Sequence, residues 1–358
     1  MNPVIPAPVP IPLPAPVWLL EFLLVFTFVL HVVAMNFLAG GVMMLTLSSF
    51  LGRHDLQHRE FARRAARAMP PVVAFTITLG VAPLLFLQLV YGQLFYTSSV
   101  LMAWSWLAVV FFVLLGYYGV YWFSLQQDEL GARAPWVILA TTVLFVFVAF
   151  IFSRNMTLML RPQDFYPLHL RHEVGSVLGP VTAPGLARLL HFLVGAAAVA
   201  GLGVALLART WRTEAPELAV WARAYGVKWF MAGTGVEFLV GLWFLFGLPQ
   251  DIRAMFLGGD RLATALLVIA VVLAMLAMVA AKRSLAAACV AIVGTLSLMA
   301  VIRHLVRVAY LRPYFDPRTL PVQGQWFVFV LFALLLVGGL ATVAWMLRAF
   351  FHPAPRAT

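Results

Sequence analysis

The length of its apolar runs constrains this chain more than any other feature. The runs cover residues 17–46, 71–97, 100–125, 136–159, 186–208, 219–248, 262–281, 284–306 and 326–350. Most of them reach or exceed the roughly 20 residues that an α-helix needs to cross a bilayer. They are continuous and do not alternate between apolar and polar residues, so they predict helices and not the strands of an outer-membrane barrel.

Composition supports the same class. The chain is 63% hydrophobic and only 10% charged, a balance that excludes a soluble domain of 358 residues. We therefore expect an all-α integral membrane protein with about nine transmembrane helices. The net charge of +11 is carried mostly by arginines at helix ends and in loops, which is typical of membrane proteins and does not indicate nucleic-acid binding. The single cysteine, Cys289, excludes an internal disulfide, a covalently attached haem and a cysteine-ligated cluster.

These patterns divide the chain into three parts. Residues 1–16 are proline-rich and uncharged, and they lack the basic region of a signal peptide, so they predict an extended N-terminal arm. Residues 17–350 form a single transmembrane domain of nine spans, without a soluble domain or a convincing repeat. Residues 351–358 are a short C-terminal tail.

The distribution of basic residues predicts the orientation. No basic residue precedes Arg53, whereas the loop 52–70 carries five arginines, so we expect the N-terminus outside and this loop in the cytoplasm. Over all nine spans this arrangement places 14 Lys and Arg residues inside and 10 outside. The C-terminus is then cytoplasmic, and the protein crosses the cell (inner) membrane several times.

Three histidines, His31, His191 and His304, fall inside the apolar runs. An imidazole is costly in lipid, and haem ligation is a common reason to find several in one helical bundle. In the predicted orientation His191 and His304 lie near the outer face, and His31 lies closer to the middle of the membrane. Each histidine could alternatively form a hydrogen bond within the bundle.

Charged residues near these histidines strengthen the haem interpretation. Arg188 and Arg307 each lie one helical turn from a histidine, and a guanidinium pairs well with a haem propionate. The alternative is that the arginines anchor helices at the level of the lipid headgroups. Glu237 is the one carboxylate deep in the sixth run, and an intramembrane glutamate predicts a proton carrier or a counter-ion.

Four motifs carry a family resemblance. They are WLLEFLLVFTFVLHVVAMNFLAGG in the first run, RNMTLMLRP at the end of the fourth, ARLLHFLVG in the fifth and His304-Leu-Val-Arg307 at the end of the eighth. Together they resemble subunit I of the cytochrome bd quinol oxidases, which has nine spans, an outer N-terminus and haems near the outer face. The resemblance implies that His31 and His191 are haem ligands. It places His304 where the family has a ligating glutamate, and Arg261 resembles the arginine that precedes the family's methionine ligand.

The chain departs from the family pattern in three places. The connection 249–261 is too short to form the family's quinol-binding loop. The family's third span carries two glutamates that deliver protons, and the matching stretch here, SSVLMAWSWLAVV, has none. Ala263 stands where the family's methionine ligand is expected. Quinol oxidation and proton delivery by the family's usual routes are therefore not expected here.

The leading hypothesis is a multi-haem b-type membrane cytochrome, a divergent bd-oxidase subunit I with two or three haems b and a d-type haem as an alternative. His31, His191 and His304 would ligate iron, and Arg188, Arg261 and Arg307 would hold propionates. Electrons would come from a donor at the outer face, a c-type cytochrome, and other membrane subunits of a respiratory complex would be partners.

Two further readings remain open from the sequence. The chain could be a terminal oxygen reductase with an altered proton route, in which Glu237 supplies protons. It could also be a haem-free transporter or a structural membrane subunit, although no inverted repeat supports transport.

Overall fold

A computed structural model describes residues 6–7, 11–173, 175–178 and 182–351. The predicted tail, 351–358, lies outside this part of the chain except for Phe351, and so do most of the first ten residues. Only helices, turns and one isolated β-bridge occur in what is described.

Nine helices of the described chain have the length of a membrane span. Eight segments are long and apolar enough to cross a membrane, and one of them, Ala103–Met159, contains two helices joined by a short 3-10 turn, Gly131–Arg133. The nine helices are α1 (Val17–Leu51), α3 (Met69–Leu101), α4 (Ala103–Leu130), α5 (Ala134–Met159), α7 (Ala183–Leu207), α8 (Pro216–Phe246), α10 (Arg261–Arg283), α11 (Leu285–Leu311) and α12 (Trp326–Phe351). The prediction of an all-α membrane protein with about nine spans is confirmed.

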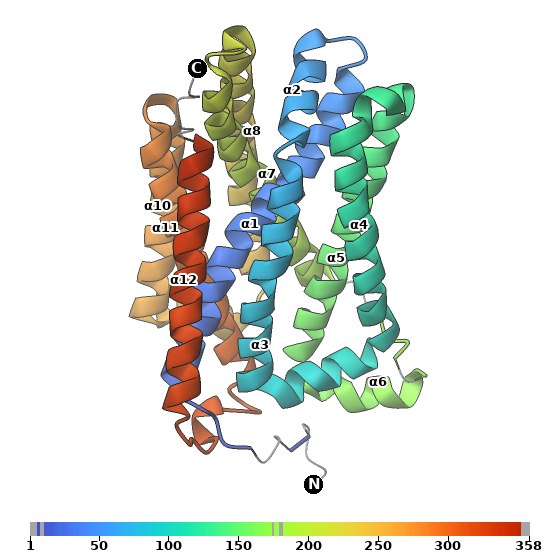
Figure 1. Ribbon diagram of the computed structural model, residues 1–358. Helices are drawn as coiled ribbons and strands as arrows, with labels where there is room; N and C mark the ends of the chain where they lie inside the picture. The colour runs from blue at the N-terminus through green and yellow to red at the C-terminus, as the bar shows by residue number, and fades with distance from the viewer. Residues whose placement is uncertain (1–5, 8–10, 174, 179–181, 352–358) are drawn as a thin grey trace.

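Three shorter helices lie in the connections, at α2 (Leu56–Ala66), α6 (Phe165–Arg171) and α9 (Gln250–Ala254). The long helices stand side by side and alternate in direction, with α2 and α6 at opposite ends of the bundle (Figure 1). We call the end that holds α6 and residues 11–16 the arm end, and the other the α2 end. Helix α1 is central, because it contacts α3, α5, α7 and α11.

Small residues bring the central helices together. Gly40 of α1 faces the backbone of Ala196 on α7, where a Cβ atom would collide. A Cβ at Gly201 of α7 would lie 2.5 Å from the carbonyl oxygen of Gly226 on α8. Because membrane helices associate largely by close van der Waals packing, these glycines fix how α1, α7 and α8 face one another.

Helix α3 is kinked at Tyr91, whose φ of −125° and ψ of 30° are not helical. After the kink, residues 92–101 run across the arm end towards α4 and meet α6 (Figure 1). The sequence predicts one continuous span over 71–97, and the structure instead bends the last part of that span into a cover over the arm end. The kink also turns Tyr91 into the bundle, where its side chain is only 1% exposed.

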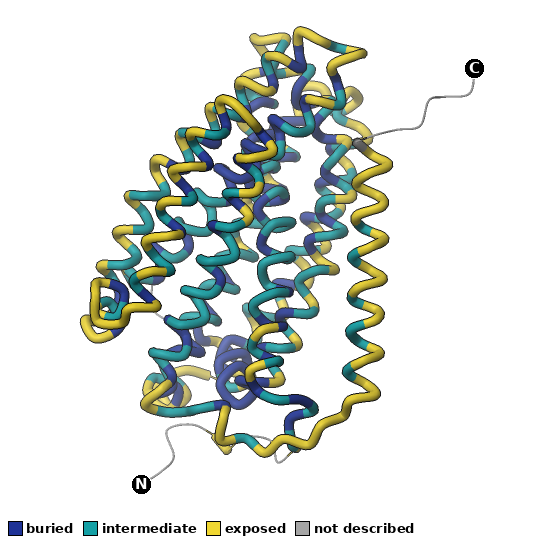
Figure 2. Tube along the Cα trace, turned by 90° about the vertical axis from the view of Figure 1, so that its left-hand side faces the viewer, coloured by how far each residue is buried: buried dark blue, intermediate teal, exposed yellow. Residues whose placement is uncertain are grey.

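Helix α12 stands apart from the other helices. None of its most apolar 18-residue window is buried, and it runs as an exposed rod beside the bundle in Figure 2. Its described contacts include a ring contact between Phe332 and Phe86, with centroids 5.5 Å apart. The connection that leads into it is held by the N-terminal arm, since the Leu13 amide donates to the carbonyl of Pro321. Lipid or another subunit must therefore cover most of α12.

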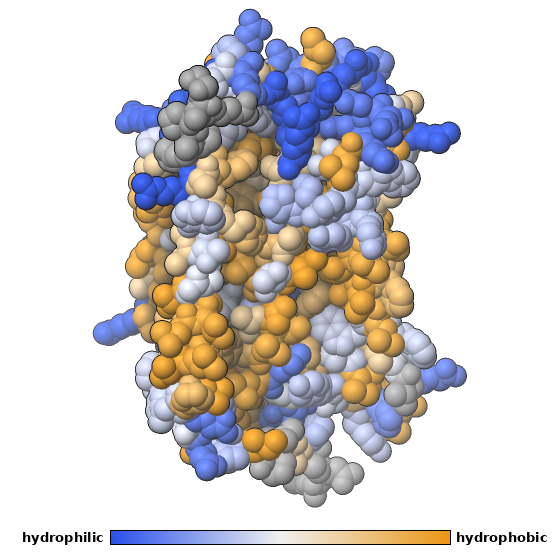
Figure 3. Space-filling model, in the orientation of Figure 1, coloured by the Kyte–Doolittle hydropathy of each residue, from blue (hydrophilic) through white to orange (hydrophobic). Residues whose placement is uncertain are grey.

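The surface has the distribution of a membrane protein. Hydrophobic side chains form a band around the middle, and hydrophilic side chains gather at both ends, most densely at the α2 end (Figure 3). The band fits the apolar part of a bilayer between two polar interfaces.

Candidate functional site

The three intramembrane histidines lie on three different helices that surround the arm half of the bundle. His31 lies on α1, His191 is eight residues from the start of α7, and His304 is seven residues from the end of α11. All three are partly buried. Each has an oxygen atom of a neighbouring helix close to one ring nitrogen, and these oxygens determine which nitrogen remains available.

His31 is held by the backbone of α3. Its Nδ1 lies 3.1 Å from the carbonyl oxygen of Thr76, and because a carbonyl only accepts, Nδ1 carries the proton and donates. Gly80 leaves room for the ring, since a Cβ there would lie 2.9 Å from Cε1 of His31. No hydrogen bond to Nε2 is found in the described part of the chain, so this nitrogen has a free lone pair.

His191 is held by a carboxylate of α8. Its Nδ1 is 2.7 Å from Oε1 of Glu237, close enough for strong attraction although the two groups lack the alignment of a hydrogen bond. A carboxylate oxygen 2.7 Å away favours the proton on Nδ1, which again leaves Nε2 free. The ring stacks on Phe244 of α8 with centroids 6.0 Å apart. The structure thus brings together two residues that the sequence singled out separately.

Arg188 belongs to the same site. Its Nη1 donates to Oγ1 of Thr157 on α5 at 2.8 Å, and its guanidinium lies over the ring of Phe244, 5.6 Å from the centroid. His191 and Arg188 therefore share Phe244 as a neighbour, as their spacing of three residues on one helix predicts.

His304 faces a carboxylate that the sequence analysis did not identify. Its Nε2 lies 3.7 Å from Oε1 of Glu21 on α1, and the same oxygen accepts a hydrogen bond of 3.0 Å from the hydroxyl of Tyr91. Nδ1 of His304 is buried and has no hydrogen-bond partner within the described residues. Glu21 is a lone carboxylate in the first apolar run, so the criterion that selected Glu237 would have found it.

Two arginines of α11 carry positive charge into this region. Arg307 is 4% exposed, lies over the ring of Tyr91 at 5.4 Å, and has a buried Nη1 without a hydrogen-bond partner in the described chain. Arg303, which the sequence analysis did not select, lies over Phe28 at 4.4 Å. Neither forms an ion pair with a described carboxylate. The charge of Glu21 acts on Arg307, whereas no described carboxylate acts on Arg303. Because buried positive charge is costly until it is balanced, the two guanidiniums favour a further anionic group between the helices.

Arg261 lies outside these contacts. It is the first residue of α10, it is exposed, and it touches none of the three histidines in the described structure. The preceding Asp260 caps α10 by accepting from the amide of Ala263 at 2.8 Å. A role of Arg261 in holding a propionate stays a prediction.

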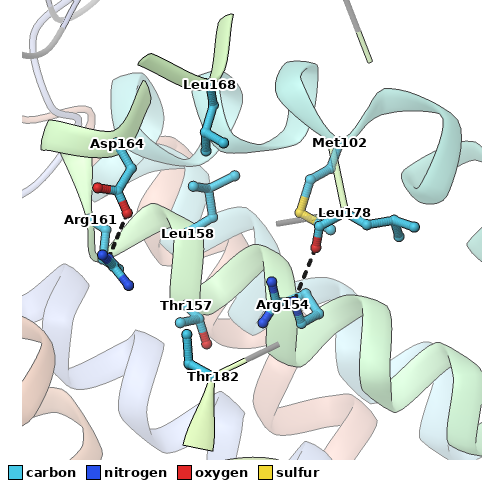
Figure 4. Close-up of a pocket in the computed structure, with 9 residues that line it drawn as sticks. All are labelled: Met102, Arg154, Thr157, Leu158, Arg161, Asp164, Leu168, Leu178 and Thr182. Carbon is cyan, nitrogen blue, oxygen red and sulfur yellow. Dashed lines mark hydrogen bonds and ion pairs between the residues drawn. The ribbon is translucent and has the colours of Figure 1, made fainter. Parts of the chain in front are cut away.

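A small cavity at the arm end adjoins the His191 site. It is lined by residues of α5, of the following turn and of α6, among them Arg154, Thr157 and Asp164 (Figure 4). Its volume is about 30 Å³, which is enough to hold a water molecule. Arg161 pairs with Asp164 at 2.6 Å, and Arg154 donates to the carbonyl of Leu178. Thr157, which lines the cavity, also accepts the hydrogen bond from Arg188 and so connects the cavity to the His191 site.

The histidines do not assemble into one metal cluster. Among the described residues no group of three or more His, Cys, Asp or Glu side chains could hold a metal ion. Haem needs no such cluster, because the porphyrin supplies four ligands and the protein one or two axial ones. His31 and His191, each with Nε2 left over, fit that requirement.

Comparisons with known proteins give a structural relationship. No family model matches the sequence, and no curated protein matches it. A chain of the bd oxidase from Geobacillus thermodenitrificans superposes with a TM-score of 0.68, covering 96% of this chain and 100% of that chain at 15% sequence identity. The chain therefore has the fold of a bd oxidase chain.

Proposed function

We propose that this chain is a haem-binding membrane subunit of a bd-oxidase-like respiratory complex that transfers electrons. The observation that carries the proposal is the setting of His31 and His191. Each presents Nδ1 to an oxygen of a neighbouring helix and keeps Nε2 free. Histidines that ligate a metal commonly have this arrangement, because the partner on one nitrogen fixes the tautomer and the ring for the other.

The side chains present fit haem. His31 and His191 would provide axial nitrogens through Nε2, and His304 would be a third ligand. Arg188, with Arg307 and its neighbour Arg303, would pair with propionates, and none of the three forms an ion pair within the described residues. Bound haem supplies iron that exchanges single electrons. We infer two or three haems b, with a d-type haem as an alternative.

Glu237 has a direct role in this arrangement. Its contact with His191 holds the imidazole in the tautomer that leaves Nε2 available and raises the basicity of that nitrogen. Its second oxygen, Oε2, is buried without a hydrogen-bond partner in the described chain. Delivery of protons by Glu237, which the sequence favours for an oxygen reductase, would be an additional role and not a replacement for this one.

We further propose that the arm end faces outside and the α2 end faces the cytoplasm of the cell (inner) membrane. The arginines of the α2 connection support this orientation. His191 and His304 then lie near the outer side, within reach of a c-type cytochrome as electron donor. The exposed α12 supports contact with another membrane subunit.

A terminal oxygen reductase is the second candidate, and the fold shared with a bd oxidase chain favours it. A haem-free transporter or structural subunit is the third candidate. The three predict different spectra. An oxygen reductase binds carbon monoxide in its reduced form, a pure electron carrier does not, and a haem-free protein is colourless.

The test is a reduced-minus-oxidised spectrum of the purified protein with its co-expressed partners, with haem quantitation and a carbon monoxide difference spectrum. We expect at least two haems per chain. A colourless protein under haem-replete expression would overturn the proposal, and a carbon monoxide shift would favour the reductase over the electron carrier.

A further inference from the structure

Arg303 is a charged residue inside a membrane span, and its position requires an explanation. It lies on α11, and its guanidinium lies over the ring of Phe28 on α1, 4.4 Å from the centroid. A cation is attracted to the face of an aromatic ring, so this contact holds the guanidinium against α1. Because an ionisable residue in a span is costly, Arg303 is by default a candidate functional residue.

Phe28 connects Arg303 to the site of His31. The two α1 residues are three positions apart, so they are neighbours on one face of the helix. The charge of Arg303 acts on the His31 ring, and no other charged side chain in the described residues is found to do so. The remaining contacts of the ring are neutral, namely the carbonyl of Thr76 and the close approach at Gly80.

No described carboxylate offsets the charge of Arg303. The charges that act on its guanidinium are those of Arg307 and Arg188, and both are positive. Arginine keeps its proton in proteins, so this charge is permanent. Its effect on a neighbouring group is stronger in the apolar interior than in water, because the effective dielectric constant is lower there.

The His191 site has a different balance of charge. The positive Arg188 lies over Phe244, on which the His191 ring stacks, but the carboxylate of Glu237 lies 2.7 Å from Nδ1 of the same ring. At His31 no described carboxylate acts on the ring. A cation without a counter-charge therefore distinguishes the surroundings of His31 from those of His191.

We propose that Arg303 raises the reduction potential of the haem that His31 ligates. This inference rests on the proposed function. A positive charge close to an axial imidazole favours the reduced iron over the oxidised iron, because the oxidised centre carries one more positive charge. A propionate paired with Arg303 would keep the sign of the effect, because removal of the guanidinium would leave the charge of that propionate unbalanced.

The test is a spectroelectrochemical titration of the purified, haem-loaded complex, with His31→Ala to identify the haem concerned. Arg303→Gln removes the charge, so the midpoint potential of the His31 haem should fall, and it should fall further than that of any other haem. Arg303→Lys keeps a positive charge and should restore most of the wild-type potential.

Arg53→Gln is the matched control. Arg53 also lies over a phenylalanine of α1, 5.3 Å from the centroid of Phe50, but it is exposed and lies just beyond the α2 end of the helix. Loss of this charge should leave every midpoint potential unchanged.

Arg303→Met is an independent variant, should Arg303→Gln fail to fold, because an apolar side chain of similar volume often replaces a buried charge without loss of stability. Three results would overturn the inference while the haem content upholds the proposed function: an unchanged potential of the His31 haem in the neutral variants, an equal fall in Arg303→Lys, or an equal fall at every haem.

Loss of the His31 haem from both neutral variants would also overturn the inference, because Arg303 would then hold this haem and not tune it. A wild-type complex without haem would instead overturn the proposed function itself, and this inference with it.

Discussion

The imidazole of His191 and the carboxylate of Glu237 lie 2.7 Å apart on two adjacent helices, α7 and α8. The glycines Gly201 and Gly226 allow those helices to approach each other at backbone distance. The contact between His191 and Glu237 therefore depends on how α7 and α8 pack at Gly201 and Gly226, further along the two helices. It also leaves Nε2 as the nitrogen of His191 that can ligate iron.

Replacement of His191 by alanine should remove one low-spin haem per chain and leave the protein folded, because apart from ligation the ring contributes only its stacking on Phe244 and its contact with Glu237. Haem quantitation and the reduced-minus-oxidised spectrum measure the loss. His172→Ala is the matched control, since His172 is exposed in the connection after α6. Equal haem content in both variants would contradict the assignment of His191.

Replacement of Gly80 by alanine should weaken the haem site at His31. A Cβ at this position would lie 2.9 Å from Cε1 of His31, so the ring must shift and its hydrogen bond to Thr76 must lengthen. We expect substoichiometric haem or an altered spectrum, similar in kind to His31→Ala.

Gly235→Ala serves as the control for that variant, because a Cβ there meets nothing within 4 Å. This control should be neutral or slightly stabilising, by roughly 0.5–1 kcal/mol, since alanine favours helix more than glycine does. A wild-type spectrum in Gly80→Ala would show that the close contact does not constrain His31.

Replacement of Gly201 by valine should destabilise the whole bundle. The new side chain would be forced against the backbone of α8, and overpacking of this kind costs about 1–3 kcal/mol. Thermal unfolding of the detergent-purified protein measures the effect, with Gly338→Ala on the exposed α12 as the control. An unchanged unfolding temperature would mean that α7 and α8 can separate without loss of stability.

The orientation can be tested by labelling engineered cysteines in intact cells. In a Cys289→Ser background, Gln323→Cys lies exposed at the arm end and His54→Cys lies exposed at the α2 end. A membrane-impermeant maleimide should label the first variant in intact cells and the second only after permeabilisation. The reverse pattern would invert the proposed orientation.

Acid should loosen the α2 end. Burial lowers the pKa of His58 below its ordinary value of 6.5, and nearby Asp55 opposes this shift only in part. The ring packs edge-on against Trp221 and Tyr225. Because the folded state disfavours the charged ring, the stability that the neutral ring of His58 contributes is lost as the pH falls below about 6.5.

Hydrogen exchange of α2 between pH 7.5 and 5.5 measures this effect. We expect protection to fall with pH in the wild type and to change less in His58→Gln, which cannot titrate. An equal response in both proteins would assign the pH dependence to another group.

The sequence by itself determined the nine spans and their approximate ends, because the length and hydropathy of each run depend only on neighbouring residues. It also selected His31, His191, His304, Arg188 and Glu237, since polar groups in apolar runs stand out without any knowledge of packing. Their roles as ligands and as partners of propionates remain predictions.

Only the tertiary structure decided which of these side chains meet. The pairing of His191 with Glu237 and of His304 with Glu21 depends on the rotation and spacing of whole helices. For α7 and α8 this spacing is set by the contact between the backbones at Gly201 and Gly226. The local sequence predicts a continuous helix through Tyr91. The kink that directs this side chain to Glu21 therefore also comes from the tertiary structure. Hydropathy fixes where a helix lies in the membrane, whereas close packing fixes which of its faces meets its neighbour.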